Sequence, residues 1–157
     1  MLKAIVIVVV LSFLLVGSAY GVLAIGRFHG PLILAMALLP LAGGKCAGLA
    51  LKRLLPDIIF GAVDTGLLTF AALAGAAGFG VAGAIVGAVV GDAITDAVAG
   101  FFEGGIAEWL RKHGIEESRT AVGSACGKMA GCLLGSGLAL TLCALAGVST
   151  SVITRVA

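Results

Sequence analysis

Charged side chains are scarce in this chain, in which Asp, Glu, Lys and Arg make up only 11% of 157 residues. Soluble domains carry about 25% charged residues, whereas 61% of this chain is hydrophobic and its mean hydropathy is +1.21. This composition excludes an ordinary soluble protein and predicts a single integral membrane domain, residues 1–157. The net charge of +2 is small and Lys and Arg form no long run, so nucleic acid is not expected as a partner.

Several patterns that mark catalytic or ligand sites are also missing. The chain has no CxxC pair, and the spacing of its cysteines fits no zinc or haem motif, so we expect inert thiols at Cys46, Cys126, Cys132 and Cys143. Gly127-Lys128 is followed by Met129, so it does not complete the GxxxxGK[ST] pattern of a phosphate-binding loop. No grouping of Ser, His and a carboxylate indicates a hydrolase.

Long apolar segments predict an all-α transmembrane bundle of about five spans, since one spanning helix needs about 20 apolar residues. Residues 58–102 are too long for one span, and the glycines between Gly75 and Gly80 favour a break. We therefore expect a hairpin made of 58–74 and 81–102. The other expected spans are 4–25, 31–51 and 120–148, and a polar turn is expected at 52–57.

The polar stretch 103–119 holds seven of the eighteen charged residues. Ile106, Trp109 and Leu110 lie there at helical spacing, which predicts a short amphipathic helix at the membrane interface. Under the positive-inside rule, the charges around the five spans place the N-terminus in the cytoplasm. The expected location is the cytoplasmic membrane of a bacterium or archaeon. Residues 1–19 also resemble a secretory signal peptide, but we expect a retained helix.

Two expected helices carry glycine at every fourth position. One row is Gly83, Gly87 and Gly91, and the other is Gly123, Gly127, Gly131 and Gly135. Residues four apart share a helix face, and helices in lipid associate through such close backbone approach. We expect the two rows to pack on each other, and at least one row could also form the interface of a homo-oligomer.

Three carboxylates interrupt the apolar run 58–102, and they are the main candidate functional residues: Asp64, Asp92 and Asp96. Charge inside a span is costly, so such residues face a protein interior or a wet cavity and commonly mark a functional site. Asp92 and Asp96 are four apart and share a helix face, with Glu103 near the same face. Asp92 and Asp96 are the candidate metal ligands, and Thr65 and Thr95 could add hydroxyl oxygens for a hard cation such as Mg²⁺ or Na⁺.

Counting residues from the ends of the spans places Lys45, Asp64, Asp96 and Lys128 at a similar depth, with Asp92 about one turn deeper. Two interpretations stay open. The lysines could neutralise the aspartates in an ion-pair network that only fixes helix register. Alternatively, the surplus carboxylate could bind a cation or relay a proton, with Lys45, Lys128 and Glu103 as charge partners.

Three hypotheses for function follow. The first is a small transporter or channel for an inorganic cation, with proton coupling as an option. The second is an enzyme acting on a lipid phosphate or alcohol at the membrane interface. In support of it, the paired acids Asp92–Asp96, the polar loop 108–119 and Gly123-Ser124-Ala125 resemble the layout of small bacterial diacylglycerol kinases over about a third of the chain. The chain lacks that family's Asn between the acids and its Lys-Asp pair before the last helix. The third is a non-catalytic scaffold or accessory subunit. The lipid bilayer and further copies of the chain are the expected partners.

Overall fold

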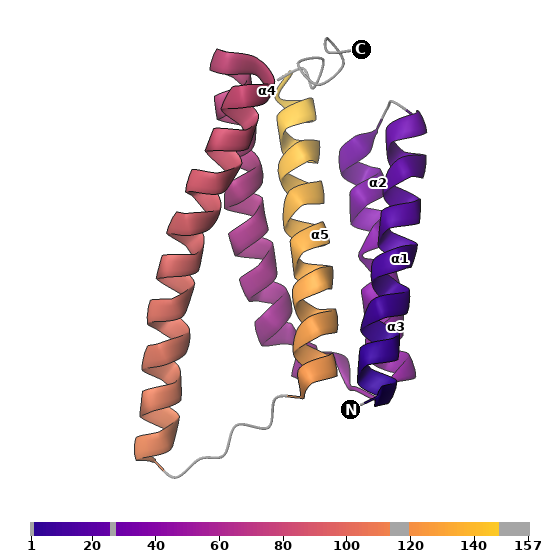
Figure 1. The fold of residues 1–157 in the computed structure, drawn as a ribbon, viewed down its shortest axis with the longest axis vertical. Coiled ribbons are helices and arrows are strands. Elements are labelled where there is room, and N and C mark those ends of the chain that lie inside the picture. The colour runs from indigo at the N-terminus through magenta and orange to yellow at the C-terminus, as the bar shows by residue number, and fades with distance from the viewer. Residues whose placement is uncertain (1, 26–27, 114–119, 148–157) are drawn as a thin grey trace.

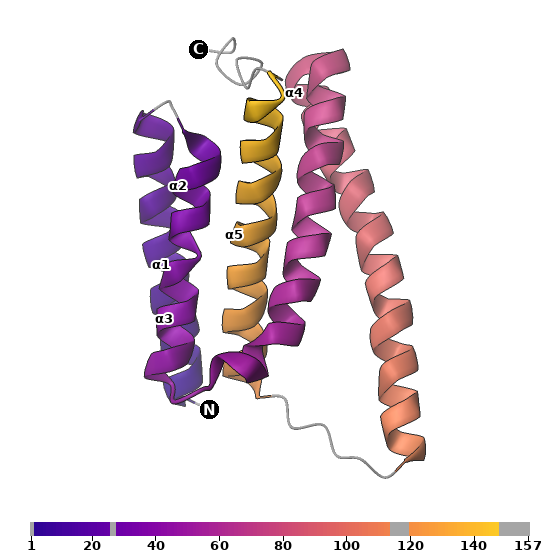
Figure 2. The same cartoon turned by 180° about the vertical axis from the view of Figure 1, so that it is seen from behind.

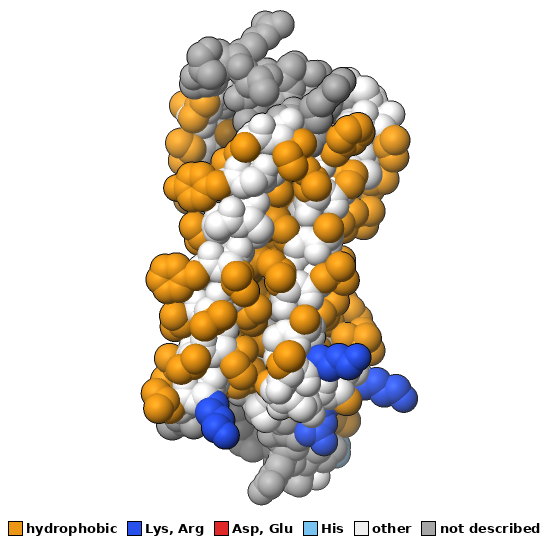
Figure 3. Space-filling model, turned by 90° about the vertical axis from the view of Figure 1, so that its right-hand side faces the viewer, with side chains coloured by type: hydrophobic (Ala, Val, Ile, Leu, Met, Phe, Trp, Pro, Cys, Tyr) orange, Lys and Arg blue, Asp and Glu red, His pale blue; other side chains and the backbone are white. Residues whose placement is uncertain are grey.

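The computed structural model describes residues 2–25, 28–113 and 120–147, and between 102 and 111 it describes most residues by their backbone alone. This part of the chain is all-helical, as predicted, with α1 (Leu2–Ile25), α2 (His29–Met36), α3 (Leu38–Cys46), α4 (Leu51–Lys112) and α5 (Ala121–Leu145). Four helical segments among the described residues are long and apolar enough to cross a membrane: 2–25, 29–46, 51–101 and 121–145. Hydrophobic side chains cover most of the face shown in Figure 3, and Lys and Arg gather at one end.

The second apolar segment, predicted as one span over 31–51 interrupted only by Lys45, is divided at Ala37 into α2 and α3, although 29–46 together remains long and apolar enough for one span. Pro40 explains the break, because its nitrogen cannot donate to the carbonyl of Met36 and its ring crowds that carbonyl. At the break, the Ala37 N–H donates to the carbonyl oxygen of Leu34 at 3.2 Å, which is three residues back and not the four of an α-helix. Helix α3 ends at Cys46, five residues before the predicted end.

Helix α4 begins at Leu51, so the predicted polar turn at 52–57 is wrong and these residues are helical. Pro56 lies inside the helix, where proline is unfavourable. Burial accounts for the difference: Leu54 and Ile58 lie in the main hydrophobic cluster with Cys126 and Ala130 of α5. Packing of this apolar face stabilises the helix through a segment that its charges and its proline mark as a break.

Helix α4 bends back on itself at Phe79 and Gly80, whose backbone angles are not helical. The glycine-rich break predicted at 75–80 is therefore shorter, and the helix runs on through Gly78. We call residues 51–78 the first arm and residues 81–112 the second arm. The arms lie side by side near the bend and diverge away from it, as both views of the ribbon show (Figures 1 and 2). The second arm continues without a break to Lys112, so the predicted separate amphipathic helix after residue 102 is part of α4.

The two glycine rows face the first arm of α4 from opposite neighbours and not each other. A Cβ added at Gly131 or Gly135 would collide with the carbonyl of Ile58 or Ala62. A Cβ at Gly83 or Gly87, on the second arm, would collide with the carbonyl of Gly75 or Ala71. The first arm therefore lies between the second arm and α5, as Figure 2 shows. The expectation that the two rows pack on each other is wrong.

Helix α5 also packs against α2, on its side away from α4. A Cβ at Gly137 would lie 2.8 Å from the Leu34 Cγ and 3.0 Å from the Gly30 carbonyl oxygen. Closer to the other end, Leu11 of α1 joins the cluster formed by Leu54, Ile58, Cys126 and Ala130. Helix α5 is thus the central helix, with α1–α3 on one side and the α4 hairpin on the other (Figure 1).

Candidate cation site

The hairpin of α4 brings together the three carboxylates that the sequence singles out. One oxygen from each of Asp64, Asp92 and Asp96 lies within 4.8 Å of the others. The register of the arms explains this: Gly75 lies against Gly83 and Ala71 against Gly87. Moving away from the bend by equal numbers of residues on both arms brings residue 94 opposite Asp64. Residue 94 lies midway between Asp92 and Asp96. The first arm thus supplies one carboxylate and the second arm supplies two from adjacent turns.

The three carboxylates differ in burial. Asp64 is half-buried, and its Oδ1 is buried without a hydrogen-bond partner. Leaving a buried carboxylate oxygen without a donor is costly, because the oxygen has lost its water. Asp92 and Asp96 are exposed on the second arm. The cluster therefore has one oxygen turned into the protein and two carboxylates open to the surroundings of the hairpin.

The two lysines that the sequence names as charge partners come from α3 and α5. Lys128 extends over the ring of Phe60, with its Nζ 5.1 Å from the ring centroid, and Lys45 is exposed near the end of α3. Of the predicted charge layer drawn from four helices, the structure brings together the three carboxylates of one hairpin, and the pairing of the lysines with them stays a prediction. Glu103 lies on the second arm, and its side chain is outside the described part of the structure.

The two threonines named as ligands have different roles. The Thr95 hydroxyl lies 3.1 Å from the backbone carbonyl oxygens of both Gly91 and Asp92, to which it can donate its proton. Its oxygen keeps lone pairs, but the side chain is oriented toward its own helix. Thr65 is half-buried beside Asp64, and its carbonyl accepts a hydrogen bond from Thr69 at 2.7 Å. Thr69 also lies 2.9 Å from Ser136 and so links α4 to α5.

The size of the cluster is suited to a cation. The centre of an equilateral triangle with 4.8 Å edges lies about 2.8 Å from each corner. Calcium–oxygen distances are about 2.3–2.6 Å and magnesium–oxygen distances about 2.0–2.1 Å. A small inward movement of the carboxylates would therefore complete contacts to a hard cation, and three negative charges favour a divalent one.

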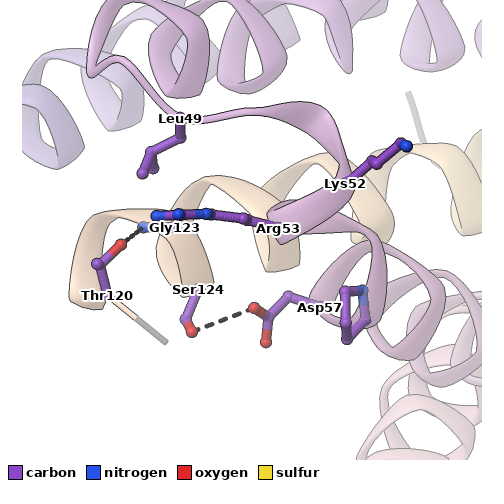
Figure 4. A pocket seen from close by; sticks show the side chains of 8 residues that line it. Leu49, Lys52, Arg53, Asp57, Thr120, Gly123 and Ser124 are labelled. Atoms are coloured by element: carbon purple, nitrogen blue, oxygen red, sulfur yellow. Dashed lines mark hydrogen bonds between the residues drawn. The ribbon is translucent and has the colours of Figure 1, made fainter. Parts of the chain in front are cut away.

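The sequence did not predict a polar cavity that lies at the end of the bundle. It has a volume of about 280 Å³ and lies between the start of α4 and the start of α5. Arg53, Asp57, Thr120 and Ser124 are among the residues that line it (Figure 4). Asp57 is only 2% exposed and accepts a hydrogen bond from the Ser124 hydroxyl at 3.1 Å. The one available signal was a carboxylate directly after Pro56, and a predicted turn at that point concealed it.

No family model, no curated protein and no solved structure matches the chain.

Proposed function

We propose that this chain is a membrane protein that binds a hard divalent cation between the arms of α4 and conducts or transports it. The proximity of Asp64, Asp92 and Asp96 carries the proposal, since their oxygens lie within 4.8 Å of one another in an otherwise apolar hairpin. Carboxylates crowded together in a region poor in water repel one another, and a bound cation relieves that repulsion. The buried, unpartnered Oδ1 of Asp64 supports a ligand on the inner side of the cluster.

The proposal includes five membrane crossings, with each arm of α4 counted as one. The apolar stretch of α4 covers 51 residues, and a single crossing uses about 20. With the N-terminus in the cytoplasm, the first arm ascends from the cytoplasmic face and the second arm returns to it. Asp64, Asp92 and Asp96 then lie within the membrane, and the glycine rows let the arms and α5 approach closely.

We further propose that a second copy of the chain covers the acidic side of the second arm. Asp92 and Asp96 are exposed in the single chain, and charged side chains within a membrane face protein or water and avoid lipid. A homo-oligomer would enclose the cluster and could provide a hydrated path to it.

Flux and binding measurements on liposomes containing the purified chain test the proposal. Entry of Mg²⁺ or Ca²⁺ is followed with an indicator dye trapped inside, and binding is measured by calorimetry. Asp64→Asn, Asp92→Asn and Asp96→Asn each remove a charge and keep the size of the side chain. Each should weaken cation binding roughly tenfold or more, because affinity follows the number of charged ligands. Glu108→Gln, an exposed acid outside the cluster, is the matched control.

The same experiment separates the alternatives. Flux and binding that are unchanged in all three Asp→Asn variants would contradict the proposal and favour a scaffold. Turnover of a lipid substrate with Mg-nucleotide, lost in Asp92→Asn, would favour the lipid-modifying enzyme.

A further inference from the structure

A second hollow lies along the same two helices as the polar cavity. It has a volume of about 410 Å³ and is lined almost wholly by apolar side chains. The first arm of α4 contributes Val63 and Phe70, and α5 contributes Leu138 and Leu142. Gly66 and Gly135 deepen it, because a Cβ at Gly66 would lie 3.6 Å from the Gly135 carbonyl oxygen. We call this hollow the apolar groove.

The polar cavity and the apolar groove follow one seam between the helices. Pro56 lines the cavity, and Val63 and Phe70, seven and fourteen residues later, line the groove. Residues seven apart differ by only about 20° around a helix. Thr120, the N-cap of α5, and Ser124 line the cavity, and Leu138 and Leu142 of α5, each eighteen residues further on, line the groove. Eighteen residues make about five complete turns, so these pairs share a face.

The polar cavity is suited to an anionic group. Lys52, Arg53 and Asp57 leave a net charge of +1 among the side chains that line it. Figure 4 shows Arg53 lying over the first turn of α5 near Gly123, while Lys52 points away from Ser124 toward the surroundings. The N-terminus of α5 adds its dipole, since Thr120 accepts a hydrogen bond from the Gly123 N–H but cannot satisfy every N–H of the first turn. Asp57 is held by Ser124 and is 2% exposed.

We propose that this seam binds one anionic phospholipid, with its phosphate at Arg53 and an acyl chain in the apolar groove. From Ser124 the seam extends eleven residues, or about 16 Å along α5, to Gly135 and eighteen residues, or about 27 Å, to Leu142. One leaflet of the hydrocarbon core is about 15 Å thick. An acyl chain that starts at a headgroup in the cavity and ends near the middle of the bilayer therefore reaches the near end of the groove, at Gly135. The charge at one end and the apolar lining at the other match the two halves of a phospholipid.

Native mass spectrometry on the full chain, released from nanodiscs of phosphatidylcholine with a few per cent phosphatidylglycerol, tests the proposal. The intact chain should retain phosphatidylglycerol in preference to phosphatidylcholine. Arg53→Gln should reduce that retention roughly tenfold, a change of about 1.4 kcal/mol, because it removes the charged donor to the phosphate. Lys112→Gln removes an exposed cation outside the cavity and should leave retention unchanged.

The proposed binding of an acyl chain is tested by a substitution that fills the apolar groove. Leu138 is 54% exposed, so Leu138→Trp should block the groove without disturbing the core and should lower retention. Ile85→Trp, at a 60% exposed position on the second arm, is its control. Equal losses in Arg53→Gln and Lys112→Gln would show general attraction to anionic membranes and overturn the proposal. Displacement of the lipid by millimolar inorganic phosphate would also overturn it, since the site would then recognise phosphate alone. Asp64→Asn should leave lipid retention unchanged, so failure of the cation site and failure of the lipid site can be told apart.

Discussion

Replacing Gly131 with alanine tests how α5 and the first arm are held together. A Cβ at Gly131 would collide with the Ile58 carbonyl oxygen and lie 2.9 Å from the Ile58 carbonyl carbon and 3.0 Å from the Ala62 nitrogen. These are backbone atoms of a helix, so they cannot rotate away and the two helices must separate. Overpacking of this kind costs about 1–3 kcal/mol. Alanine also has a higher helix propensity than glycine by about 1 kcal/mol, which offsets part of the cost.

Gly17→Ala is the matched control, because nothing lies within 4 Å of a Cβ at that position in α1. It gains the propensity without the collision. The two variants should therefore differ by about 1–3 kcal/mol in free energy of unfolding, with Gly131→Ala the less stable. For a chain of this length, that corresponds to roughly 2–12 °C in melting temperature. Thermal unfolding in detergent, followed by circular dichroism at 222 nm, measures the difference. Equal melting temperatures for the two variants would refute the conclusion that the α5 glycine row sets this helix contact.

Two further predictions concern the hairpin and its attachment to α5. Gly80 has φ 59° and ψ −143°, a conformation that side chains disfavour, so Gly80→Ala should lower stability by about 1–3 kcal/mol. Gly78→Ala, which is helical and has nothing within 4 Å, should not lower it; equal melting temperatures would contradict this account of the bend. Thr69→Val should cost about 1 kcal/mol through loss of the contact with Ser136, measured by the same thermal unfolding. Ser12→Val, whose hydroxyl donates only to its own helix at Val8, should have a smaller effect, and the reverse order would show that the Thr69–Ser136 contact does not stabilise the bundle.

Hydropathy and residue spacing predicted the helical class and the three acidic residues at the site, because both depend on short-range geometry. Asp92 and Asp96 share a face in any helix, and a hairpin between residues 74 and 81 returns that helix toward Asp64. The same spacing could not show where the lysines would point. Lysine has a long side chain that extends toward the nearest favourable surroundings, and the Lys128 Nζ lies over the ring of Phe60. Depth along a helix therefore predicted the proximity of the short aspartate side chains, whereas the reach of the long lysine side chains does not follow from depth alone.

The start of α4 shows a second limit of the sequence. Lys52, Arg53, Pro56 and Asp57 together predict a turn, yet they lie in a helix whose buried face is formed by Leu54 and Ile58. Local preference favours a break there, and packing against Cys126 and Ala130 outweighs it. This packing also creates the polar cavity, because it brings Asp57 to within hydrogen-bonding distance of Ser124. Residues 67 positions apart in the sequence meet there, and no local pattern contains that pairing.

The glycine rows and the acidic cluster depend on each other through the register of the hairpin. Gly83 and Gly87 can approach Gly75 and Ala71 only where both backbones are bare or nearly so. That requirement fixes which residues of the two arms are opposite, and the arrangement extends by whole helical turns to Asp64, Asp92 and Asp96. A displacement by one residue would turn each helix face by about 100° and separate the carboxylates. Glycines that take no part in binding therefore determine whether three carboxylates from two arms meet at one point.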